Sequence, residues 1–575
     1  MVSTAANAVP DEGVRVLPMG EGALLIELPA ADPARVLAVH AALESAPPPG
    51  VIELVPAART VLVVFDASML RAAAARTWVA ETAASARPDP DAVTGPPIVL
   101  DVVYDGPDLA ETARVLGMDP DTLAARHEAA AWTVAFTGFA PGFAYLVSPD
   151  WTFDVPRLTD PRTRVPAGSV ALAGGYSGAY PRATPGGWRL IGTTAAPLLD
   201  PAPLLAPGDA VRFRRIRTAA TPLAPPAATA PPALTAPAPS EPRRITPTSE
   251  DSAGNVRTSR DSPKFEHLEH PEHPEHLEHL EHFATPAAFV VVQPGPLTTI
   301  QDLGRRAAAL GIARSGALDR AALRAANRLV GNPEDAAGLE VTMGGFRARA
   351  MRDLWIAATG ASAPLRIAGR RVDAQVAHAW PGGAELELGM PARGVRTYLA
   401  VRGGIEAPAV VGSRATDTMS GLGPDPLRAG SDVVVGCGAV APIPVLEFPP
   451  WGEPQDDEIE LDLAPGPRAE WFSASSRERL FTEVWTVAGD ADRRGVRLDG
   501  PADRGLDRIR DAELPSEGMV PGAIQVPPSG RPTILLADGP VTGGYPVVAV
   551  VADASLDALA QARPGTRIRF RHIRA

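Results

Sequence analysis

A motif in three parts, present twice in the chain, restricts the possible folds more than any other feature of this sequence. The first copy consists of residues 165–170 (VPAGSV), 180–181 (YP) and 207–213 (PGDAVRF). The second copy consists of residues 520–524 (VPGAI), 545–546 (YP) and 564–570 (PGTRIRF). Order and spacing recur together, which indicates two related structural units. In each unit a Pro-Gly turn leads into a final apolar strand, as is typical of small β-barrels.

A weaker third copy and many short apolar runs extend this interpretation to most of the chain. Residues 428–435 (RAGSDVVV) repeat the turn and the final strand, so we expect three related β-barrels. Runs of strand length, bounded by Gly and Pro, occur at 23–28, 60–65, 98–104, 289–292, 354–358 and 395–401. Helices are predicted after the N-cap residues Asp119 and Asp319, and the second helix is predicted to end before Gly331. The sequence therefore predicts a mainly β protein with some α structure.

A segment of low complexity divides the chain into two blocks, 11–216 and 286–575. Between them the sequence is rich in Ala, Pro and Thr and then contains Glu-His six times from Glu266 to His282. The prolines disfavour helix, so we predict a disordered linker that tethers the two blocks. Capture of a metal ion by the six histidines is the alternative, although the repeat fixes no ligand geometry.

The composition excludes several classes of function. A net charge of −13 argues against a nucleic acid or an anionic membrane as the partner. No signal-peptide pattern or long apolar segment occurs, so we expect a cytoplasmic protein. Cys437 is the only cysteine, which excludes a disulfide framework, a CxxC zinc site and an iron–sulfur cluster. Lys264, in the low-complexity segment, is the only lysine, which argues against a Walker A loop, a pyridoxal site and a biotin carrier.

The densest cluster of glycine and aromatic residues, 136–145 (FTGFAPGFAY), is the candidate binding loop of the first block. Gly142 in this loop, and Gly175 farther along the chain, would let backbone amides approach an anion closely. Arg162 and Arg164 lie nearby in the sequence, and guanidinium groups are the available anion ligands in a chain with one lysine. Packing of a buried loop explains the same cluster equally well.

Polar residues of the second block recur where the chain turns and form a second candidate set. They are Gln301, Asp302, Arg305, Ser315, Asp319 and Asn327. They can converge on one cleft, whereas Asp302 and Asp319 are equally well explained as turn and N-cap residues. His127 in the first block is a candidate general base, although a single histidine more often caps or packs. A Ser-His-Asp triad is not supported, because the sequence has no Gly-x-Ser-x-Gly elbow.

Several long strings resemble the two subunits of the allophanate hydrolase family. The first block is similar to subunit 1 at 136–146 (FTGFAPGFAYL) and 161–170 (PRTRVPAGSV). The second block is similar to subunit 2 at 299–305 (TIQDLGR), 315–319 (SGALD), 326–327 (AN) and 542–546 (TGGYP). Two strings depart from the family pattern, since Gly20-Glu21 replaces Gly-Asp and 538–542 (DGPVT) replaces a Gln-Thr-Thr string.

This resemblance implies cyclophilin-like β-barrels, one of them preceded by a small α/β domain. The expected boundaries are 11–95 for the α/β domain, 96–216 for the first barrel, 217–285 for the linker, and 286–440 and 441–575 for the two barrels of the second block. The two halves are thus expected to be joined by a disordered linker.

The resemblance also implies a function, as the B and C subunits of an ATP-dependent 5-oxoprolinase fused in one chain. Such a hydrolase activates 5-oxo-L-proline with ATP, expected here with Mg²⁺ and without a covalent cofactor. The separate A subunit of the enzyme, which is a LamB/YcsF-type protein, would complete hydrolysis to L-glutamate. Two alternatives stay open: the carboxyltransferase component of a biotin-dependent urea carboxylase, and a non-enzymatic pair that inhibits a sporulation kinase. A homo-oligomer is also compatible with the sequence.

The residues expected to perform this chemistry come from both blocks. The expected catalytic residues are His127, Arg164, Asp302 and Arg305. The expected substrate- or phosphate-binding residues are Gly142, Arg162, Gly175, Gln301, Arg314, Ser315, Asp319, Asn327, Thr542, Gly543 and Tyr545. No metal site built from protein side chains is expected. Guanidinium groups and glycine amides would hold anions in a cleft shared by the two blocks.

Overall fold

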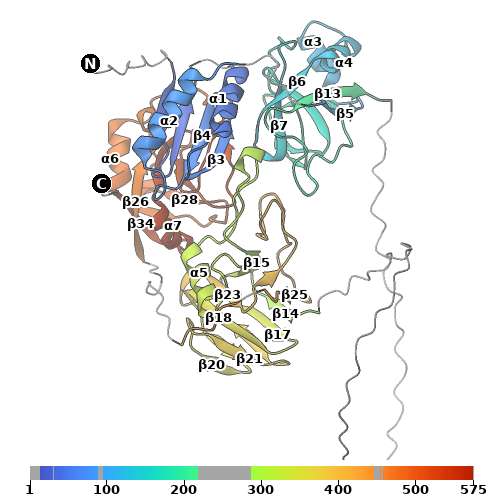
Figure 1. Ribbon diagram of the computed structural model, residues 1–575. Helices are drawn as coiled ribbons and strands as arrows, with labels where there is room; N and C mark the ends of the chain where they lie inside the picture. Colours follow the sequence, from blue (N-terminus) through green and yellow to red (C-terminus); the bar gives the residue numbers. More distant parts are fainter. Residues whose placement is uncertain are drawn as a thin grey trace, which may run out of the picture. The chain divides into compact units, whose positions relative to one another are not determined.

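The computed structural model describes residues 13–29, 32–88, 95–217, 286–438, 440–445, 454 and 457–573. The predicted linker, with its Glu-His repeat and Lys264, lies outside the described residues except for residue 217. The described parts of both blocks belong to one compact unit (Figure 1). They consist mainly of strands and include β-barrels, which confirms the predicted fold class.

The first domain is a four-stranded sheet with two helices on one face (Figure 1). The strands, in the order β1-β2-β4-β3, are β1 (Arg15–Pro18), β2 (Ala23–Glu27), β4 (Thr60–Phe65) and β3 (Val51–Pro56). The helices are α1 (Pro33–Ser45) and α2 (Ala72–Ser85). Helix α1 begins where the Asp32 side chain accepts hydrogen bonds from the amides of Ala34 and Arg35, with Pro33 in the first turn.

Strand β2 is buried on both of its faces. Leu24 and Ile26 pack against the two helices. Leu25, which points the other way, packs with Leu62 of β4 against Val550 of the second block. Because successive side chains of a strand alternate between its faces, an uninterrupted apolar strand requires a cover on each side. The sheet therefore uses its second face to bind the last barrel of the chain.

The first barrel follows in the same block. Its seven-stranded sheet, in the order β12-β9-β10-β7-β6-β13-β5, contains β12 (Arg189–Thr193), β9 (Ser169–Ala173), β10 (Tyr176–Ala179), β7 (Ala140–Val147), β6 (Trp132–Gly138), β13 (Ala210–Arg215) and β5 (Ile98–Val102). Mutual backbone hydrogen bonds of 2.9 and 2.8 Å between Val103 and Thr193 join the two outer strands. Helices α3 (Leu109–Val115) and α4 (Pro120–Ala129) precede β6, and β8 (Arg162–Val165) pairs with β11 (Thr184–Gly186).

The first half of the second block has two sheets around one apolar core. The seven-stranded sheet contains β20 (Arg370–Val372), β19 (Leu365–Ile367), β22 (Glu385–Leu388), β17 (Phe346–Ala350), β14 (Phe289–Pro294), β25 (Asp432–Val435) and β24 (Ile405–Glu406). The five-stranded sheet contains β15 (Leu297–Gln301), β16 (Gly338–Thr342), β23 (Arg393–Val401), β18 (Leu354–Ser362) and β21 (His378–Trp380). The 3-10 helix η1 (Ala308–Leu310) and helix α5 (Arg320–Leu329) lie between β15 and β16 in the sequence.

The last part of the chain forms a closed barrel. Its strands, in the order β26-β33-β30-β31-β28-β27-β34, are β26 (Glu458–Pro465), β33 (Val547–Val551), β30 (Ala523–Gln525), β31 (Thr533–Leu535), β28 (Gly495–Asp499), β27 (Trp485–Val487) and β34 (Arg567–His572). Its other elements are η2 (Ala469–Trp471), α6 (Ala474–Thr482), η3 (Pro501–Asp503), β29 (Glu517–Gly518), β32 (Thr542–Gly543) and α7 (Asp553–Ala560).

The repeated motif encodes the turn and the strand that complete two of these units. Gly208 and Gly565 have φ of +92° and +91°, a left-handed conformation that glycine adopts readily. The strands that follow, β13 and β34, each pair in parallel with the first strand of their own barrel. In the weaker third copy Gly430 has φ of +85°, but β25 pairs antiparallel with β14 instead.

Candidate functional site

A cavity of about 720 Å³ is lined by residues of both blocks. The first-domain sheet contributes Val64, and the last barrel contributes Leu535 and Val550, so one wall is apolar. The charged wall comes from the segment around η1 and α5. It contains Arg305, Arg306, Arg314, Arg320 and Arg324. Five guanidinium groups on one cavity favour an anionic ligand, because each can form paired hydrogen bonds with phosphate or carboxylate oxygens.

The arginines of this cavity differ in whether a carboxylate of the protein pairs with them. Arg320 pairs with Asp553 at 2.8 Å, and Arg324 lies 3.8 Å from Glu334. Arg306 and Arg314 form no ion pair within the described part of the chain. Desolvation on the cavity side lowers the pKa of Arg314, although the side chain is exposed and a ligand can therefore reach it. The cavity thus offers two guanidinium groups that a ligand can neutralise.

Arg305 lies deeper, with 2% of its surface exposed. It donates one hydrogen bond from Nη2 to the carbonyl of Ala415, while its Nε and Nη1 have no partner among the described residues. Desolvation lowers its pKa, although the carboxylates of Asp417 and Asp302 raise it. The Oγ of Ser315 is likewise buried, with no partner in the described structure. Unsatisfied buried polar groups are costly, so these atoms are candidates for ligand or water contacts.

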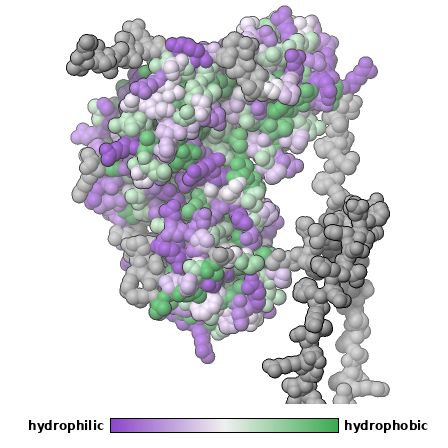
Figure 2. Space-filling model, in the orientation of Figure 1, coloured by the Kyte–Doolittle hydropathy of each residue, from purple (hydrophilic) through white to green (hydrophobic). Residues whose placement is uncertain are grey.

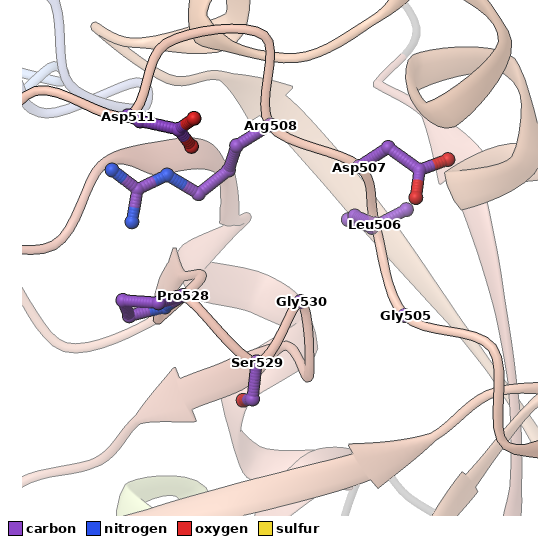
Figure 3. Close-up of a pocket in the computed structure, with 8 residues that line it drawn as sticks. All are labelled: Gly505, Leu506, Asp507, Arg508, Asp511, Pro528, Ser529 and Gly530. Atoms are coloured by element: carbon purple, nitrogen blue, oxygen red, sulfur yellow. The ribbon is translucent and has the colours of Figure 1, made fainter.

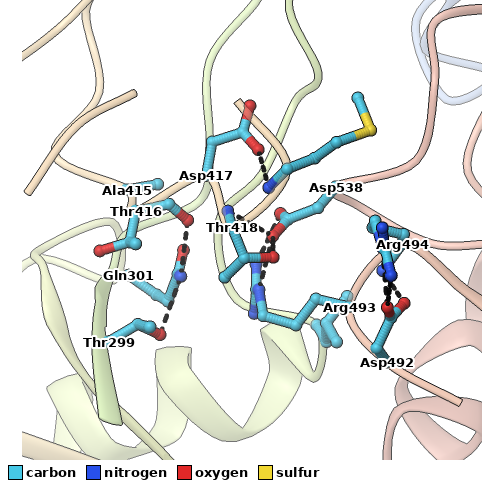
Figure 4. Close-up of polar contacts among 12 residues, drawn as sticks. Thr299, Gln301, Ala415, Thr416, Asp417, Thr418, Asp492, Arg493, Arg494 and Asp538 are labelled. Atoms are coloured by element: carbon cyan, nitrogen blue, oxygen red, sulfur yellow. Dashed lines mark hydrogen bonds and ion pairs between the residues drawn. The ribbon is translucent and has the colours of Figure 1, made fainter. Parts of the chain in front are cut away.

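Gln301 and Asp302 support this wall and do not face the cavity. Gln301 Nε2 donates to Thr299 Oγ1 and to the carbonyl of Thr416, both at 3.0 Å (Figure 4). Asp302 accepts from the amide of its own turn at Gly304, at 2.8 Å. It also accepts from the Ser413 hydroxyl and from the amide of Arg414, both at 2.7 Å. The geometry therefore supports the alternative of a turn residue for Asp302, and its catalytic role stays a prediction.

Arg493 fixes the loop that carries Ser315. Its guanidinium pairs with both oxygens of Asp538 at 3.0 Å (Figure 4). It also pairs with Glu340 and donates to the carbonyl of Gly316 at 2.7 Å. Burial alone would lower the pKa of Arg493, but the two carboxylates raise it. This buried cluster joins the last barrel to the cavity wall.

A second buried cluster joins the first-domain sheet to the last barrel. Arg468 pairs with Glu517, and its Nη2 lies 2.9 Å from Glu27 Oε1 on β2. Glu27 also pairs with Arg15 at 3.0 Å and with Arg59 at 3.3 Å. Burial raises the pKa of Glu517, despite the neighbouring guanidinium. The two sides of the cavity are therefore connected by charge pairs as well as by apolar packing.

The aromatic loop of the first barrel contacts the second block instead of lining the cavity. Thr137 Oγ1 donates to the carbonyl of Ala309 at 2.7 Å, and the amide of Phe139 donates to Thr542 Oγ1 at 3.3 Å. A Cβ on Gly138 would lie 1.9 Å from that Thr542 oxygen. Glycine is required here because the two blocks approach each other this closely. The two blocks therefore pack directly against each other at this loop.

His127 is a core residue, which contradicts its predicted role as a general base. The side chain is fully buried, with Nδ1 2.8 Å from the Tyr104 hydroxyl and Nε2 2.7 Å from Ser177 Oγ. The centre of its ring lies 4.3 Å from that of Phe213. Desolvation lowers its pKa to about 3, so it is neutral at neutral pH. Both nitrogens are occupied and no substrate can reach them.

The buried neutral state of His127 predicts a loss of stability in acid. Between pH 6.5 and pH 3 the unfolded chain binds a proton that the folded chain does not, so this group should reduce stability by about 1.4 kcal/mol per pH unit. His127→Gln should be less stable than the wild type at pH 7, and the difference should shrink as the pH falls. Urea unfolding at pH 7, 6 and 5 measures this, with His378→Gln at a partly exposed position as the control. A difference that stays constant with pH would contradict the expectation.

The other candidates of the first block do not reach the cavity. Arg162 pairs with Asp108 at 2.7 Å. Arg164 is exposed on β8, and Gly175 is exposed next to β9. Gly142 is buried with φ of +77°, and a Cβ there would lie 3.1 Å from the carbonyl oxygen of Leu198. Gly142 therefore lies in a buried turn and Arg164 lies on the surface. The structure does not bring these four residues together into a second site.

Four further candidates of the second block, Asp319, Asn327, Gly543 and Tyr545, do not line the cavity. Asp319 caps α5 by accepting from the amide of Ala322 at 2.9 Å, and it accepts from Gln561 at 2.7 Å. Desolvation raises its pKa to about 7. Asn327 donates to the carbonyl of Ala336 at 2.7 Å. Gly543 pairs with Glu517 through β32 and β29, and Tyr545 is exposed. Of all predicted site residues, only Arg305, Arg314 and Ser315 line the cavity.

A smaller pocket of about 280 Å³ is formed by two loops of the last barrel, at residues 505–511 and 528–530 (Figure 3). Its only arginine, Arg508, donates to the carbonyls of Arg510 and Ala512 at 3.2 and 3.3 Å. The same guanidinium lies 5.8 Å from the centre of the Trp471 ring. This cation holds its own loop, and no predicted site residue lines the pocket. The larger cavity is therefore the better candidate.

Several charged residues of the cavity were not predicted from the sequence. Arg306, Arg320, Arg324 and Glu53 are among them. The sequence does show a cluster of arginines, since five occur between positions 305 and 324. Two of them, Arg320 and Arg324, lie in the first half of α5. Glu53 carried no signal in the sequence, because no recognisable motif surrounds it in residues 51–56 (VIELVP).

Comparisons with known proteins agree with this division into two blocks. Residues 14–204 match the model for the carboxyltransferase domain, subdomains C and D, and residues 310–572 match subdomains A and B. The C subunit of 5-oxoprolinase from Escherichia coli K12 is 36% identical over 293 residues, which cover 49% of this chain and 89% of that protein. The chain belongs to the carboxyltransferase-domain family. It combines both halves of the domain in one polypeptide.

Further relatives of this carboxyltransferase-family chain support the same assignment. The B subunit of 5-oxoprolinase from Escherichia coli O157:H7 is 47% identical over 123 residues, 20% of this chain and 56% of that protein. A crystal structure of the protein TTHA0988 has a TM-score of 0.73 and 33% identity, covering 96% of this chain and 99% of that one. The urea amidolyase of Lachancea kluyveri is 31% identical, but the match covers 17% of its length. A fusion of sequences like the B and C subunits is thus confirmed.

Neither a metal cluster nor a membrane helix is found in the described structure. No group of three or more His, Cys, Asp or Glu side chains there has the arrangement of a metal site. No described helix has the length and apolar character needed to cross a membrane. On the face shown in Figure 2, hydrophilic and hydrophobic residues are mixed.

Proposed function

We propose that this chain is the combined B and C component of an ATP-dependent 5-oxoprolinase and that the arginine-lined cavity is its reaction site. The observation that carries the proposal is the composition of the cavity. Its apolar wall comes partly from the first block, and its five arginines come from the second. Relatives named as the B and C subunits of 5-oxoprolinase match the chain. A site lined by both blocks explains why one activity would need both kinds of sequence.

The chemistry of this reaction fits a cavity rich in arginine. A five-membered lactam is unstrained and stabilised by resonance, so its hydrolysis needs coupling to ATP. Transfer of a phosphoryl group to the lactam oxygen requires stabilisation of several negative oxygens, which Arg305, Arg306 and Arg314 would provide. Magnesium would enter with the nucleotide, because Mg²⁺ keeps phosphate and water ligands and needs only one or two carboxylates. Glu21 and Asp66 line the cavity and fit that need.

The carboxyltransferase alternative is supported only in part. The family models and the urea amidolyase match concern the same kind of domain. That reaction would need biotin on a carrier supplied by another protein, since the only lysine of this chain lies in the low-complexity segment. Inhibition of a sporulation kinase stays a prediction from the resemblance.

Release of ADP in the presence of 5-oxoproline tests the proposal. The full chain is assayed with ATP and Mg²⁺, with and without a LamB/YcsF-type protein as the A subunit. We expect 5-oxoproline to stimulate ADP release, most strongly when the LamB/YcsF-type protein is present. Absence of stimulation in both mixtures would contradict the proposal. Carboxylation of urea with a biotinylated carrier, in place of ADP release, would favour the alternative.

A further inference from the structure

Glu53 is a carboxylate of the first block that lines the cavity near Arg306 and Arg314. It lies on β3, at a position where the pairing with β4 shifts between Val51 and Glu53. This irregularity leaves Ile52 as an extra residue on β3, and both Ile52 and Glu53 line the cavity. A β-bulge commonly redirects a side chain toward a functional site. The local backbone thus explains how a strand of the outer domain reaches the cavity.

One oxygen of Glu53 is held and the carboxylate is otherwise unpaired in the described structure. Oε1 accepts a hydrogen bond of 2.9 Å from the amide of Ala308, the first residue of η1. No ion pair to Glu53 occurs among the described residues, although the cavity contains five arginines. The contact with Ala308 crosses from the first block to the second. It orients the group and leaves Oε2 available to a ligand.

Several other charged groups line the cavity that contains Glu53. Arg306 and Arg314 are near enough to favour its ionised form. Glu21 and Asp66 lie on the first-domain side, and the Arg320–Asp553 pair also lines the cavity. Desolvation nevertheless outweighs the arginines and raises the pKa of Glu53. A carboxylate of raised basicity beside anion-binding groups has the properties of a general base.

We propose that Glu53 is the base that removes the lactam N–H proton when the lactam oxygen is phosphorylated. The inference rests on the proposed function of the cavity. The lactam oxygen forms a bond to the γ-phosphorus, and the bond from that phosphorus to the β,γ-bridging oxygen breaks. Its electron pair leaves with ADP. The lactam nitrogen forms a double bond to carbon as its proton moves to Glu53 Oε2. The guanidinium groups of Arg306 and Arg314 hold the transferred phosphoryl group.

Glu53→Gln tests this role, because the amide oxygen can still accept from Ala308 while the basic oxygen is lost. We expect kcat for ADP release with 5-oxoproline to fall by about 10²–10⁴-fold. The acidic limb of the wild-type kcat–pH profile, which should lie above pH 4.5, should disappear in the variant. The dissociation constant for ATP, measured by calorimetry on the full chain, should change less than about threefold. The matched control is Glu81→Gln on the exposed side of α2, which should behave as the wild type.

The outcomes separate this inference from the proposed function. A wild-type chain that never responds to 5-oxoproline overturns both. A responsive wild type with Glu53→Gln within about threefold in kcat, or with its acidic limb retained, overturns only the role of Glu53. A variant that has lost both turnover and ATP binding also overturns it, because Glu53 would then organise the cavity and not transfer a proton. Partial recovery of kcat in Glu53→Asp, together with the acidic limb, supports the proposal.

Discussion

Replacement of Arg314 by alanine is expected to reduce kcat/KM for 5-oxoproline-dependent ADP release by about 10²–10³-fold, the typical effect of losing one charged donor to a transition state. Arg314 lines the cavity and forms no ion pair within the described residues. Its removal therefore leaves none of the described carboxylates without a partner. Because the guanidinium binds two oxygens at once, Arg314→Lys should recover only part of the activity.

Arg314 is a sharper test than Arg305. Arg305 also donates to the carbonyl of Ala415, so its replacement disturbs a loop as well as a ligand site. Arg371→Ala on the exposed strand β20 is the matched control for loss of one arginine, and its kinetics should equal those of the wild type. Steady-state rates and the thermal midpoint are measured for all variants. If Arg314→Ala stays within about threefold of wild type at an unchanged midpoint, this arginine does not contact the reacting groups.

Replacement of Arg493 by methionine is expected to lower the free energy of unfolding by about 3–5 kcal/mol. The variant leaves Asp538 and Glu340, whose side chains are 0% and 1% exposed, without their common counter-charge. Glu340 keeps Arg396 at 3.6 Å, whereas Asp538 loses its ion pair, and an uncompensated buried carboxylate is among the most costly single defects in a folded protein. The hydrogen bond to Gly316 is lost as well, so the cavity wall at Ser315 should loosen.

The neighbouring arginine provides the control for this experiment. Arg494 has a side chain that is 60% exposed and pairs with Asp492 on the surface (Figure 4). Arg494→Met should therefore cost less than about 1 kcal/mol. Urea unfolding followed by tryptophan fluorescence measures both variants. Equal effects at the two positions would show that the buried cluster is not what holds the loop.

The fold class could be predicted because its signals in the sequence are local. The repeated Pro-Gly turns require glycine in a left-handed conformation, and the structure has this conformation at Gly208 and Gly565. Apolar runs of strand length and N-cap residues such as Asp119 act within a few residues of each other. The pairing partners were less predictable, as β25 shows, because a strand's own residues do not specify whether its neighbour runs parallel or antiparallel.

The candidate site was only partly predictable, for a different reason. The scarcity of lysine indicated arginine as the available anion ligand, and Arg305, Arg314 and Ser315 do line the cavity. His127 and Asp302 have the residue types of catalytic groups, yet full burial assigns the first a structural role and the turn hydrogen bonds of the second support one. Residue type gives possible chemistry, whereas burial and hydrogen-bond partners decide which chemistry is available.

The amino-acid sequence by itself determined the division into two blocks, the mainly β fold, the repeated barrel ending and the use of arginine for nearly every cationic position. Only the tertiary structure decided that Glu53 of the first block lies beside Arg306 and Arg314 of the second. The reason is physical. Turn conformations and strand propensities act over a few residues, but the cavity exists only where the sheet of the first domain packs on the last barrel, through contacts between residues hundreds of positions apart.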